Sequence, residues 1–406
     1  MSRVASVRLR RIFDSRGKET VEAVVGLVDG AEATAGAPSG ASTGTHEVQA
    51  FPAGGVTEVL GPLAPSIRSA LLAPGEVDQA GFDARLHALD GTPNFARIGG
   101  NTATALSLAF ALAEARAHGQ LLAERLRRPG LPPAYPAIAG NCMNGGRHAI
   151  GGPEFQEFLA FSVAPDPADA VPVALAVHHA VGEALHRKLP TYALGRGDEG
   201  GWVAPLSNGE ALELFVAACA EVRDRWKLPV HPGLDLAASE FYRDGRYVYR
   251  DRSLDPEAQI AYVAELVDRY GIRYLEDPLE QEAFGDFATL TKAVGAKTLV
   301  IGDDLYTTRT ERLRRGIEGR SSNAILIKVN QVGTVTDTLA TVDLARAHGL
   351  ATVTSHRSGD LPEGWLAHLA VATGAAGLKC GLLGGERVAK LNELLRVAAA
   401  TGAPPE

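Results

Sequence analysis

Six apolar runs in the second half of the chain each end on an ionisable residue, and this pattern constrains the fold most. Amphipathic segments of helical period separate the runs, for example residues 255–270 and 335–349. Buried strands that alternate with helices predict a parallel α/β unit. In a barrel of this kind the strand ends meet at one mouth, where active sites lie. The residues that end the runs are Asp235, Glu276, Asp303, Lys328, His356 with Arg357, and Lys379.

Three of these residues predict a metal site. Asp235, Glu276 and Asp303 end successive runs, and carboxylate oxygens are the ligands that a hard cation such as Mg²⁺ prefers. One aspartate after a strand is more often a helix N-cap. Three converging carboxylates, however, repel one another unless a cation is bound. The neighbouring Asp277 and Asp304 should point away from the barrel interior and act as supporting groups or caps.

The two lysines at strand ends predict proton-transfer chemistry. Lys328 and Lys379 are each embedded in an apolar strand, where an ordinary surface lysine is uncommon. Burial, a metal and a second cation would lower the pKa of Lys328 and make it a usable general base. The alternative is a lysine whose stem packs along the strand while its ammonium reaches water.

Further polar groups occur in glycine-rich loops and at one strand end. Arg357 and Ser358 together could bind a carboxylate or a phosphate. Glu199, in the loop GRGDEGG, could be a general acid if its pKa is raised; the alternative is a turn residue. The segments NGGRHA and FQEF offer His148, Gln156 and Glu157.

Length and composition predict two domains in a globular protein. The chain has 406 residues, 46% of them hydrophobic and 22% charged, with a net charge of −8. The negative charge argues against a nucleic-acid or anionic-membrane partner. Three cysteines without paired spacing, no apolar leader and no long apolar run predict a soluble, cytoplasmic protein without disulfides.

The first part of the chain is organised differently from the second. Residues 21–30 predict a strand closing on a turn, and residues 103–126 predict a helix. The proline-rich segment 127–136 suits a linker, so we place a domain boundary near residue 130, between domains 1–130 and 131–406. The segment 38–47 is rich in Gly, Ser and Thr and predicts either a surface loop or a mobile lid.

These groups suit one type of reaction. A base removes a proton next to a carboxylate, a metal stabilises the charge that develops, and an acid helps a leaving group depart from the adjacent carbon. Longer motifs support this type of reaction. Through them the chain resembles the enolase family (phosphopyruvate hydratases). The motifs that occur in the enolase order are FDSRGKETVE, PSGASTGTHE, DGTPN, NGGRHA with QEF, GDEGG, LDLAASEFY, EDPL, GDDLYTT, ILIKVNQVGT, SHRSG and ERVAKLNELLR.

The resemblance implies a fold and a metal site. The fold would be an enolase-type α/β barrel (a modified TIM barrel whose early strands depart from βα alternation), capped by an N-terminal α+β domain. Asp235, Glu276 and Asp303 match the ligands of the tight Mg²⁺ site, and Ser42 in the lid matches a ligand of a second Mg²⁺. Lys328 matches the base that takes the C2 proton of 2-phosphoglycerate.

The resemblance also assigns the substrate contacts. Glu199, supported by Glu157, matches the acid that helps the C3 hydroxyl leave. Lys379 matches the lysine that holds the substrate carboxylate, and Arg357 with Ser358 matches the phosphate contact. The residues at the remaining pocket positions are His148, Gln156 and His356. Glu22 and Arg396 match an intersubunit ion pair, which implies a homodimer. The resemblance as a whole implies that the substrate is a small phosphorylated carboxylic acid.

Some loops depart from the enolase pattern. The segment 48–59 and the loop after Asp235 are shorter than usual, the acidic stretch after Ser358 is altered, and Arg147 stands where a small or acidic residue is common. These departures leave an alternative, a paralogue similar to carboxyphosphonoenolpyruvate synthase of phosphonate biosynthesis. A non-catalytic binding protein is a third reading, which the full set of ionisable groups disfavours.

Overall fold

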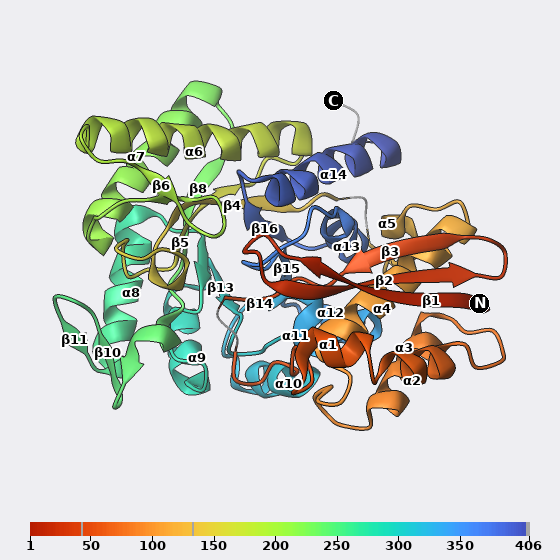
Figure 1. The fold of residues 1–406 in the computed structure, drawn as a ribbon. Helices are drawn as coiled ribbons and strands as arrows, with labels where there is room; N and C mark the ends of the chain where they lie inside the picture. The colour runs from red at the N-terminus through yellow and green to blue at the C-terminus, as the bar shows by residue number, and fades with distance from the viewer. Residues whose placement is uncertain (42–43, 132–133, 403–406) are drawn as a thin grey trace.

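The computed structural model describes residues 1–41, 44–131 and 134–402, and most of them belong to a closed barrel (Figure 1). Its strands follow the order β16-β15-β14-β13-β12-β8-β5-β4, and pairing of β16 with β4 closes the ring. Strand β5 runs antiparallel to both of its neighbours, whereas the other neighbours pair in parallel. The barrel strands are β4 (Ala137–Asn144), β5 (Glu157–Ser162), β8 (Val230–Asp235), β12 (Tyr274–Glu276), β13 (Leu299–Gly302), β14 (Ala324–Ile327), β15 (Ala351–Ser355) and β16 (Gly377–Gly381).

Helices cover the outside of the barrel (Figure 1). Their ends carry the expected signals: in α8 the Asp255 carboxylate caps the Ala258 N–H at 2.9 Å, and Gly271 ends the helix with a φ of 64°. The helices are α6 (Pro167–Lys188), α7 (Asn208–Trp226), α8 (Pro256–Tyr270), α9 (Phe284–Val294), α10 (Thr310–Gly319), α11 (Val329–Val332), α12 (Val335–Ala347), α13 (Trp365–Thr373) and α14 (Gly385–Thr401).

The N-terminal part is a three-stranded antiparallel sheet in the order β1-β2-β3, packed against helices. The hydrophobic face of the sheet lies on α4, which is buried along most of its length. The predicted α+β domain and α/β barrel are therefore confirmed. The elements are β1 (Val4–Phe13), β2 (Glu19–Leu27), β3 (Glu32–Gly36), α1 (Gly55–Leu60), α2 (Ala64–Leu71), α3 (Gln79–Asp90), α4 (Gly100–Ala117) and α5 (Leu122–Arg125).

Most of the predicted elements are confirmed, with one correction. The helices predicted at 255–270 and 335–349 correspond to α8 and α12, and the strand predicted within 21–30 is part of β2. The helix predicted over 103–126 is wrong as a single element. It is broken between α4 and α5, where Gly119 adopts a φ of 62° that a continuing helix does not allow.

Small elements fill the loops at the ends of the barrel strands. They are η1 (Gly146–His148), β6 (Gly195–Arg196), β7 (Trp202–Val203), η2 (Ala238–Phe241), β9 (Tyr242–Arg243), β10 (Arg246–Val248) and β11 (Ser253–Leu254). The three cysteines are free and buried, as expected. Within the described residues, no helix is both long and apolar enough to cross a bilayer.

The alternation of side chains along each strand divides the barrel interior into two layers. On β14, Ala324 and Leu326 point inward, so the next inward position is Lys328 at the end of the strand. The deeper layer is apolar, and the layer above it, at the mouth, is charged. The buried residues of the deeper layer are Ala139, Leu159, Phe161, Tyr274, Ile301, Ala324, Leu326 and Val353.

Candidate active site

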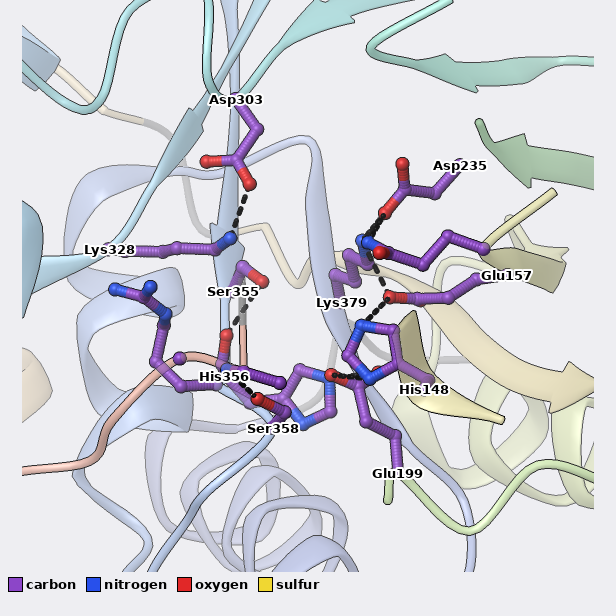
Figure 2. A pocket seen from close by; sticks show the side chains of 14 residues that line it. His148, Glu157, Glu199, Asp235, Asp303, Lys328, Ser355, His356, Ser358 and Lys379 are labelled. Carbon is purple, nitrogen blue, oxygen red and sulfur yellow. Dashed lines mark hydrogen bonds and ion pairs between the residues drawn. The ribbon is translucent and has the colours of Figure 1, made fainter. Parts of the chain in front are cut away.

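The predicted polar residues gather around a small cavity at the mouth of the barrel (Figure 2). Its volume is about 20 Å³, room for about one water molecule. Glu276 lies just outside the lining and contacts Lys379, and Ser42 falls outside the described residues. The predicted residues that line the cavity are His148, Gln156, Glu157, Glu199, Asp235, Asp303, Lys328, His356, Arg357, Ser358 and Lys379.

Lys379 links three carboxylates from neighbouring strands. Its Nζ lies 2.9 Å from Asp235 Oδ2, 2.8 Å from Glu276 Oε1 and 3.2 Å from Glu157 Oε1. Burial alone would lower the pKa of Lys379, but the surrounding carboxylates outweigh it and raise this pKa well above its ordinary value. Lys379 is therefore a fixed positive charge at the centre of the mouth.

Lys328 contacts Asp303, and without a metal this contact opposes the lowering of the lysine pKa that we expect when a metal is bound. The ammonium of Lys328 bonds to Asp303 Oδ2, while Gln331 donates to Asp303 Oδ1 at 2.8 Å. Burial lowers the pKa of Lys328, but the Asp303 carboxylate more than offsets it, and the pKa is raised. A cation held by Asp303 would cancel this effect of the carboxylate.

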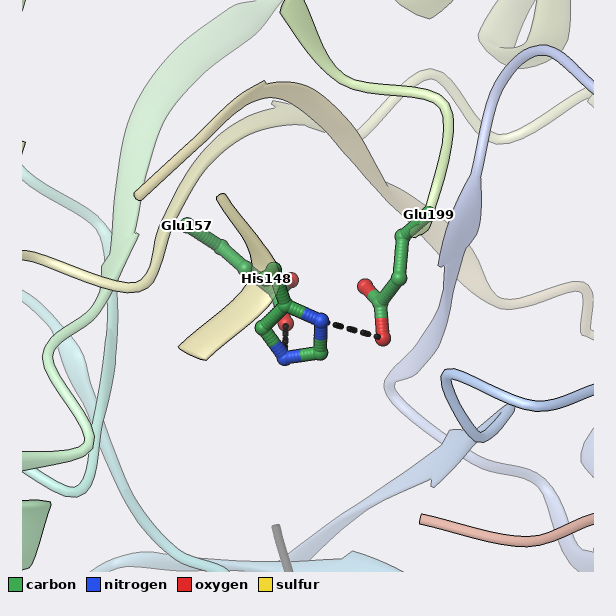
Figure 3. A group of neighbouring side chains, drawn as sticks. All are labelled: His148, Glu157 and Glu199. Carbon is green, nitrogen blue, oxygen red and sulfur yellow. Dashed lines mark ion pairs between the residues drawn. The ribbon is translucent and has the colours of Figure 1, made fainter. Parts of the chain in front are cut away.

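Glu157 and Glu199 face each other across the His148 ring (Figure 3). Nε2 of His148 lies 3.9 Å from Glu157 Oε1, and Nδ1 lies 3.7 Å from Glu199 Oε1. Burial and the Glu199 charge raise the pKa of Glu157 well above its ordinary value. Burial also acts to raise the pKa of Glu199, but His356 and His148 outweigh it and lower this pKa well below its ordinary value. The pKa values of the two carboxyl groups are thus shifted in opposite directions, which favours the neutral form of Glu157 over that of Glu199.

His356 is the other contact of Glu199. Its Nε2 lies 3.1 Å from Glu199 Oε2, and its Nδ1 lies 2.7 Å from Nη1 of Arg387. The ring is buried, and burial is the main reason why the pKa of His356 falls to about 4. His356 is therefore a neutral imidazole at neutral pH.

The lid segment reaches the cavity from the N-terminal domain. Ser39 N–H donates to Gly359 O at 2.8 Å, and Ala41 N–H donates to Ser358 Oγ at 2.5 Å. Further along the lid, the Glu47 carboxylate accepts from Nη1 and Nη2 of Arg357 at 2.9 and 3.0 Å. The part of the lid that the structure describes is therefore docked over the mouth.

The carboxylates at the mouth form a donor set of hard oxygens, although the predicted trio is not a compact cluster here. Within the described residues, the groups whose ligand atoms lie within 4.8 Å of one another are His148-Glu157-Glu199 and Asp277-Asp303-Asp304. Lysine ammoniums instead contact the trio of Asp235, Glu276 and Asp303. Burial and the charge of Asp235 raise the pKa of Glu276 to about 8, an excess of negative charge that a divalent cation would relieve.

The backbone after these carboxylates is tightly turned. Asp277 has a φ of 37°, and its carboxylate accepts from the N–H groups of Asp303 at 2.9 Å and Asp304 at 2.7 Å. Of the two expectations for Asp277, the structure fits a supporting group behind Asp303 and not a helix cap. Ala237 and Thr307 also have positive φ, at 47° each. Unfavourable backbone conformations of this kind persist where the surroundings hold them, often at functional sites.

Sequence reasoning missed several residues that support the site. Asn141 donates to Glu199 Oε2 at 3.1 Å, and inward alternation along β4 was a signal for it. Glu47 and Arg387 lie inside recognised motifs, but nothing in the sequence showed which side chains they would contact. Gln331 was likewise part of a motif, and its contact to Asp303 depends on how α11 follows β14.

The fold and the site define a class of protein, an α/β-barrel enzyme with buried carboxylates, lysines and histidines gathered at the strand ends. The comparisons give the family. The model of the enolase N-terminal domain matches residues 4–126, and that of the enolase C-terminal TIM barrel domain matches residues 133–404. The chain belongs to the enolase family, and it is accordingly a hydro-lyase.

Similar proteins support this over nearly the whole chain. The enolase of Methanothermobacter thermautotrophicus is 46% identical over 400 residues, covering 97% of this chain and 96% of the relative. The enolase of Natronomonas pharaonis is 44% identical, covering 98% and 100% respectively. The enolase of Picrophilus torridus is 40% identical, covering 97% and 98%. These relatives lend no support to the phosphonate alternative.

Proposed function

We propose that this enzyme catalyses the reversible, Mg²⁺-dependent dehydration of 2-phosphoglycerate to phosphoenolpyruvate, the reaction of glycolysis and gluconeogenesis. The observation that carries the proposal is the placement of Lys328 and the Glu157-Glu199 pair on opposite sides of one cavity (Figure 2). A base on one side and an acid pair on the other suit removal of a proton and of a hydroxyl from adjacent carbons.

Asp235, Glu276 and Asp303 would hold the tight-site Mg²⁺, because their buried oxygens suit a hard cation. When bound, the metal supplies positive charge that stabilises the negative charge developing on the substrate carboxylate. Lys379 adds a second, fixed positive charge for the same carboxylate. Ser42, outside the described residues, is proposed to join a second Mg²⁺ with the substrate.

Lys328 would remove the C2 proton with its neutral amine. In the structure its ammonium is paired with Asp303, so the base must first lose its proton and this contact. Glu199 would then help the C3 hydroxyl leave as water by giving it a proton. Glu157, whose pKa is raised, and His148, which lies between the two carboxyl groups, would support this transfer.

Arg357 and Ser358 would bind the phosphate, with His148, Gln156 and His356 shaping the rest of the pocket. The guanidinium of Arg357 is buried and already oriented by Glu47 and by Asn330 Oδ1, the latter at 2.8 Å. A pre-oriented guanidinium loses little conformational freedom when it binds a phosphate.

The test is formation of phosphoenolpyruvate from 2-phosphoglycerate, followed by ultraviolet absorbance with and without Mg²⁺. Turnover of about 1 s⁻¹ or more, within the ordinary enzyme range, supports the proposal. No turnover, with Mg²⁺ still stabilising the fold, contradicts it and points to a different substrate such as a phosphonate. No turnover and no Mg²⁺ effect would favour a non-catalytic binding protein.

A Glu199→Gln variant tests the order of the two steps. The variant should lose dehydration but keep exchange of the C2 proton with solvent, because the proton leaves before the hydroxyl. Exchange is measured by loss of deuterium from substrate labelled at C2. Loss of both activities together would show that Glu199 does more than supply the departing hydroxyl with a proton.

We also propose a homodimer. Arg396 is 67% exposed and pairs with Glu393, one turn before it on α14, at 2.8 Å, whereas Glu22 contacts Arg10 on the neighbouring strand. A partner chain could recruit both residues. Light scattering on the purified protein measures the mass, and an Arg396→Ala variant should shift it toward the monomer if this pair contributes.

A further inference from the structure

Arg387, in the first turn of α14, is the charged residue on which the two loops of the acid side converge. Its side chain is fully buried. Its Nη2 donates to Asp198 O at 2.9 Å and to Ser358 O at 2.5 Å. Its Nη1 lies 2.6 Å from Arg357 O and 3.2 Å from Asp360 Oδ2. The guanidinium therefore joins the loop that carries Glu199 to the loop that follows β15.

The contact of Arg387 with His356 decides where the imidazole carries its proton. A guanidinium N–H donates and cannot accept, so Nδ1 of His356, 2.7 Å from Nη1, must be the acceptor. The Gly381 N–H also points to Nδ1, at 3.5 Å. The proton of the neutral ring then lies on Nε2, which donates to Glu199 Oε2 at 3.1 Å.

The carboxylates around His356 would favour the doubly protonated, cationic ring over the neutral one. Glu199 lies at Nε2, and Asp360 Oδ2 lies 3.9 Å from Nδ1. Two carboxylates on opposite sides of an imidazole favour the doubly protonated cation. Arg387 disfavours the doubly protonated ring, because it is cationic and lies on the Nδ1 side. Lys390, 3.0 Å from Asp360 Oδ2, also neutralises part of the charge of that carboxylate.

We propose that Arg387 is a positioning residue for the acid side of the site: it holds His356 as the neutral ring protonated on Nε2, so that this ring donates to Glu199 and keeps it oriented until substrate binds. Its effect on turnover rests on the function proposed above. Its effect on the position of the proton on His356 is independent of that proposed function.

The experiment measures the imidazole nitrogens of His356 by NMR on the full chain with ¹⁵N-labelled histidine, in the native protein and in Arg387→Lys and Arg387→Met. A His356→Gln variant assigns the signal. Lys390→Met is the matched control, since it removes a buried cation from the same helix and from Asp360 without a contact to His356. His368, bonded to Glu393 of α14 at 2.9 Å, reports whether the helix stays folded.

We expect the native ring to show an unprotonated Nδ1 and a protonated Nε2 at neutral pH. The Lys390→Met ring should change less than the Arg387→Met ring, because Lys390 acts on His356 through Asp360 rather than by contact. In Arg387→Met the ring should become doubly protonated, with an intermediate state in Arg387→Lys. The kcat of the Met variant should fall by about 100-fold, and the acid limb of the pH profile should move to higher pH. Should the Met variant fail to fold, the Lys variant decides.

Two results overturn the inference: a His356 signal that is the same in the Arg387 variants as in the native protein, or an equal change in Lys390→Met. A native protein that makes no phosphoenolpyruvate but shows the expected nitrogen signals would contradict the proposed function and leave the role of Arg387 intact.

Discussion

The two layers inside the barrel share the same strands but are stabilised by opposite means. In the deeper layer, Leu326 and Val353 are fully buried among other apolar side chains. At the mouth, the inward position that follows Leu326 is Lys328, and β16 contributes Lys379; both ammoniums contact carboxylates. The deeper layer gains free energy by removing apolar surface from water, whereas the mouth holds charges that burial disfavours.

The difference shows that the charged groups at the mouth contribute less to stability than the apolar groups beneath them. A buried ion pair gains little net stability, but removing one partner leaves the other charge uncompensated. The mouth is therefore expected to respond to metal, pH and single charge changes, and the deeper layer only to changes in volume.

The largest effect is expected at the mouth. Lys328→Ala should reduce the rate of C2 proton exchange and of dehydration by about 10²- to 10⁴-fold, because no other described side chain stands in its place as a base. Rates from labelled substrate check this. Lys297→Ala, which removes an exposed lysine paired with Asp268, is the control and should leave both rates unchanged. Exchange retained by Lys328→Ala would rule out its role as the base.

A change in the deeper layer should alter stability but not chemistry. Leu326→Ala should lower the free energy of unfolding by about 2–5 kcal/mol, since it leaves a cavity among packed side chains. Urea unfolding measures this, and kcat should stay at the native value. Leu326→Met, which conserves volume, should cost less than about 1.5 kcal/mol. A large loss of kcat in either variant would mean that the two layers are coupled.

Acid should lower the free energy of unfolding through His356 at the mouth. The pKa of His356 is lowered to about 4, mainly by burial, against about 6.5 in the unfolded chain. The unfolded state therefore binds more protons between these values, and stability falls as pH drops through that window, by about 3 kcal/mol in total. His356→Gln should remove this part of the pH dependence, whereas Leu326→Ala should keep it. Equal pH dependence of stability in the native and His356→Gln proteins would show that His356 is not its source.

Magnesium should give the smallest of these effects. At 100 times its dissociation constant, a cation that binds only the folded state stabilises it by about 2.7 kcal/mol. Thermal unfolding with and without Mg²⁺ should show this shift in the native protein and in Leu326→Ala. Asp303→Asn, which removes a proposed ligand charge, should weaken it. A full shift in Asp303→Asn would place the metal elsewhere.

The strand-end residues were predictable because a strand repeats every two residues. Once apolar runs such as 324–327 are recognised as strands, the inward position that follows each run is determined. The same logic placed Asp235 and Lys379 at one mouth, and it predicted Asp277 as a supporting group, which in the structure accepts from the backbone of Asp303. The helix predicted at 103–126 failed because periodicity alone did not reveal the break at Gly119.

The sequence by itself determined the barrel, the capping domain and the set of ionisable groups, since periodicity and motif order are local properties of the chain. Only the tertiary structure decided which charges meet. It showed that Asp303 raises the pKa of Lys328, that the pKa of Glu157 is raised while that of Glu199 is lowered, and that Arg387 contacts His356. Such effects depend on distances between side chains far apart in the chain, because electrostatic interactions in a buried site change steeply over a few ångströms.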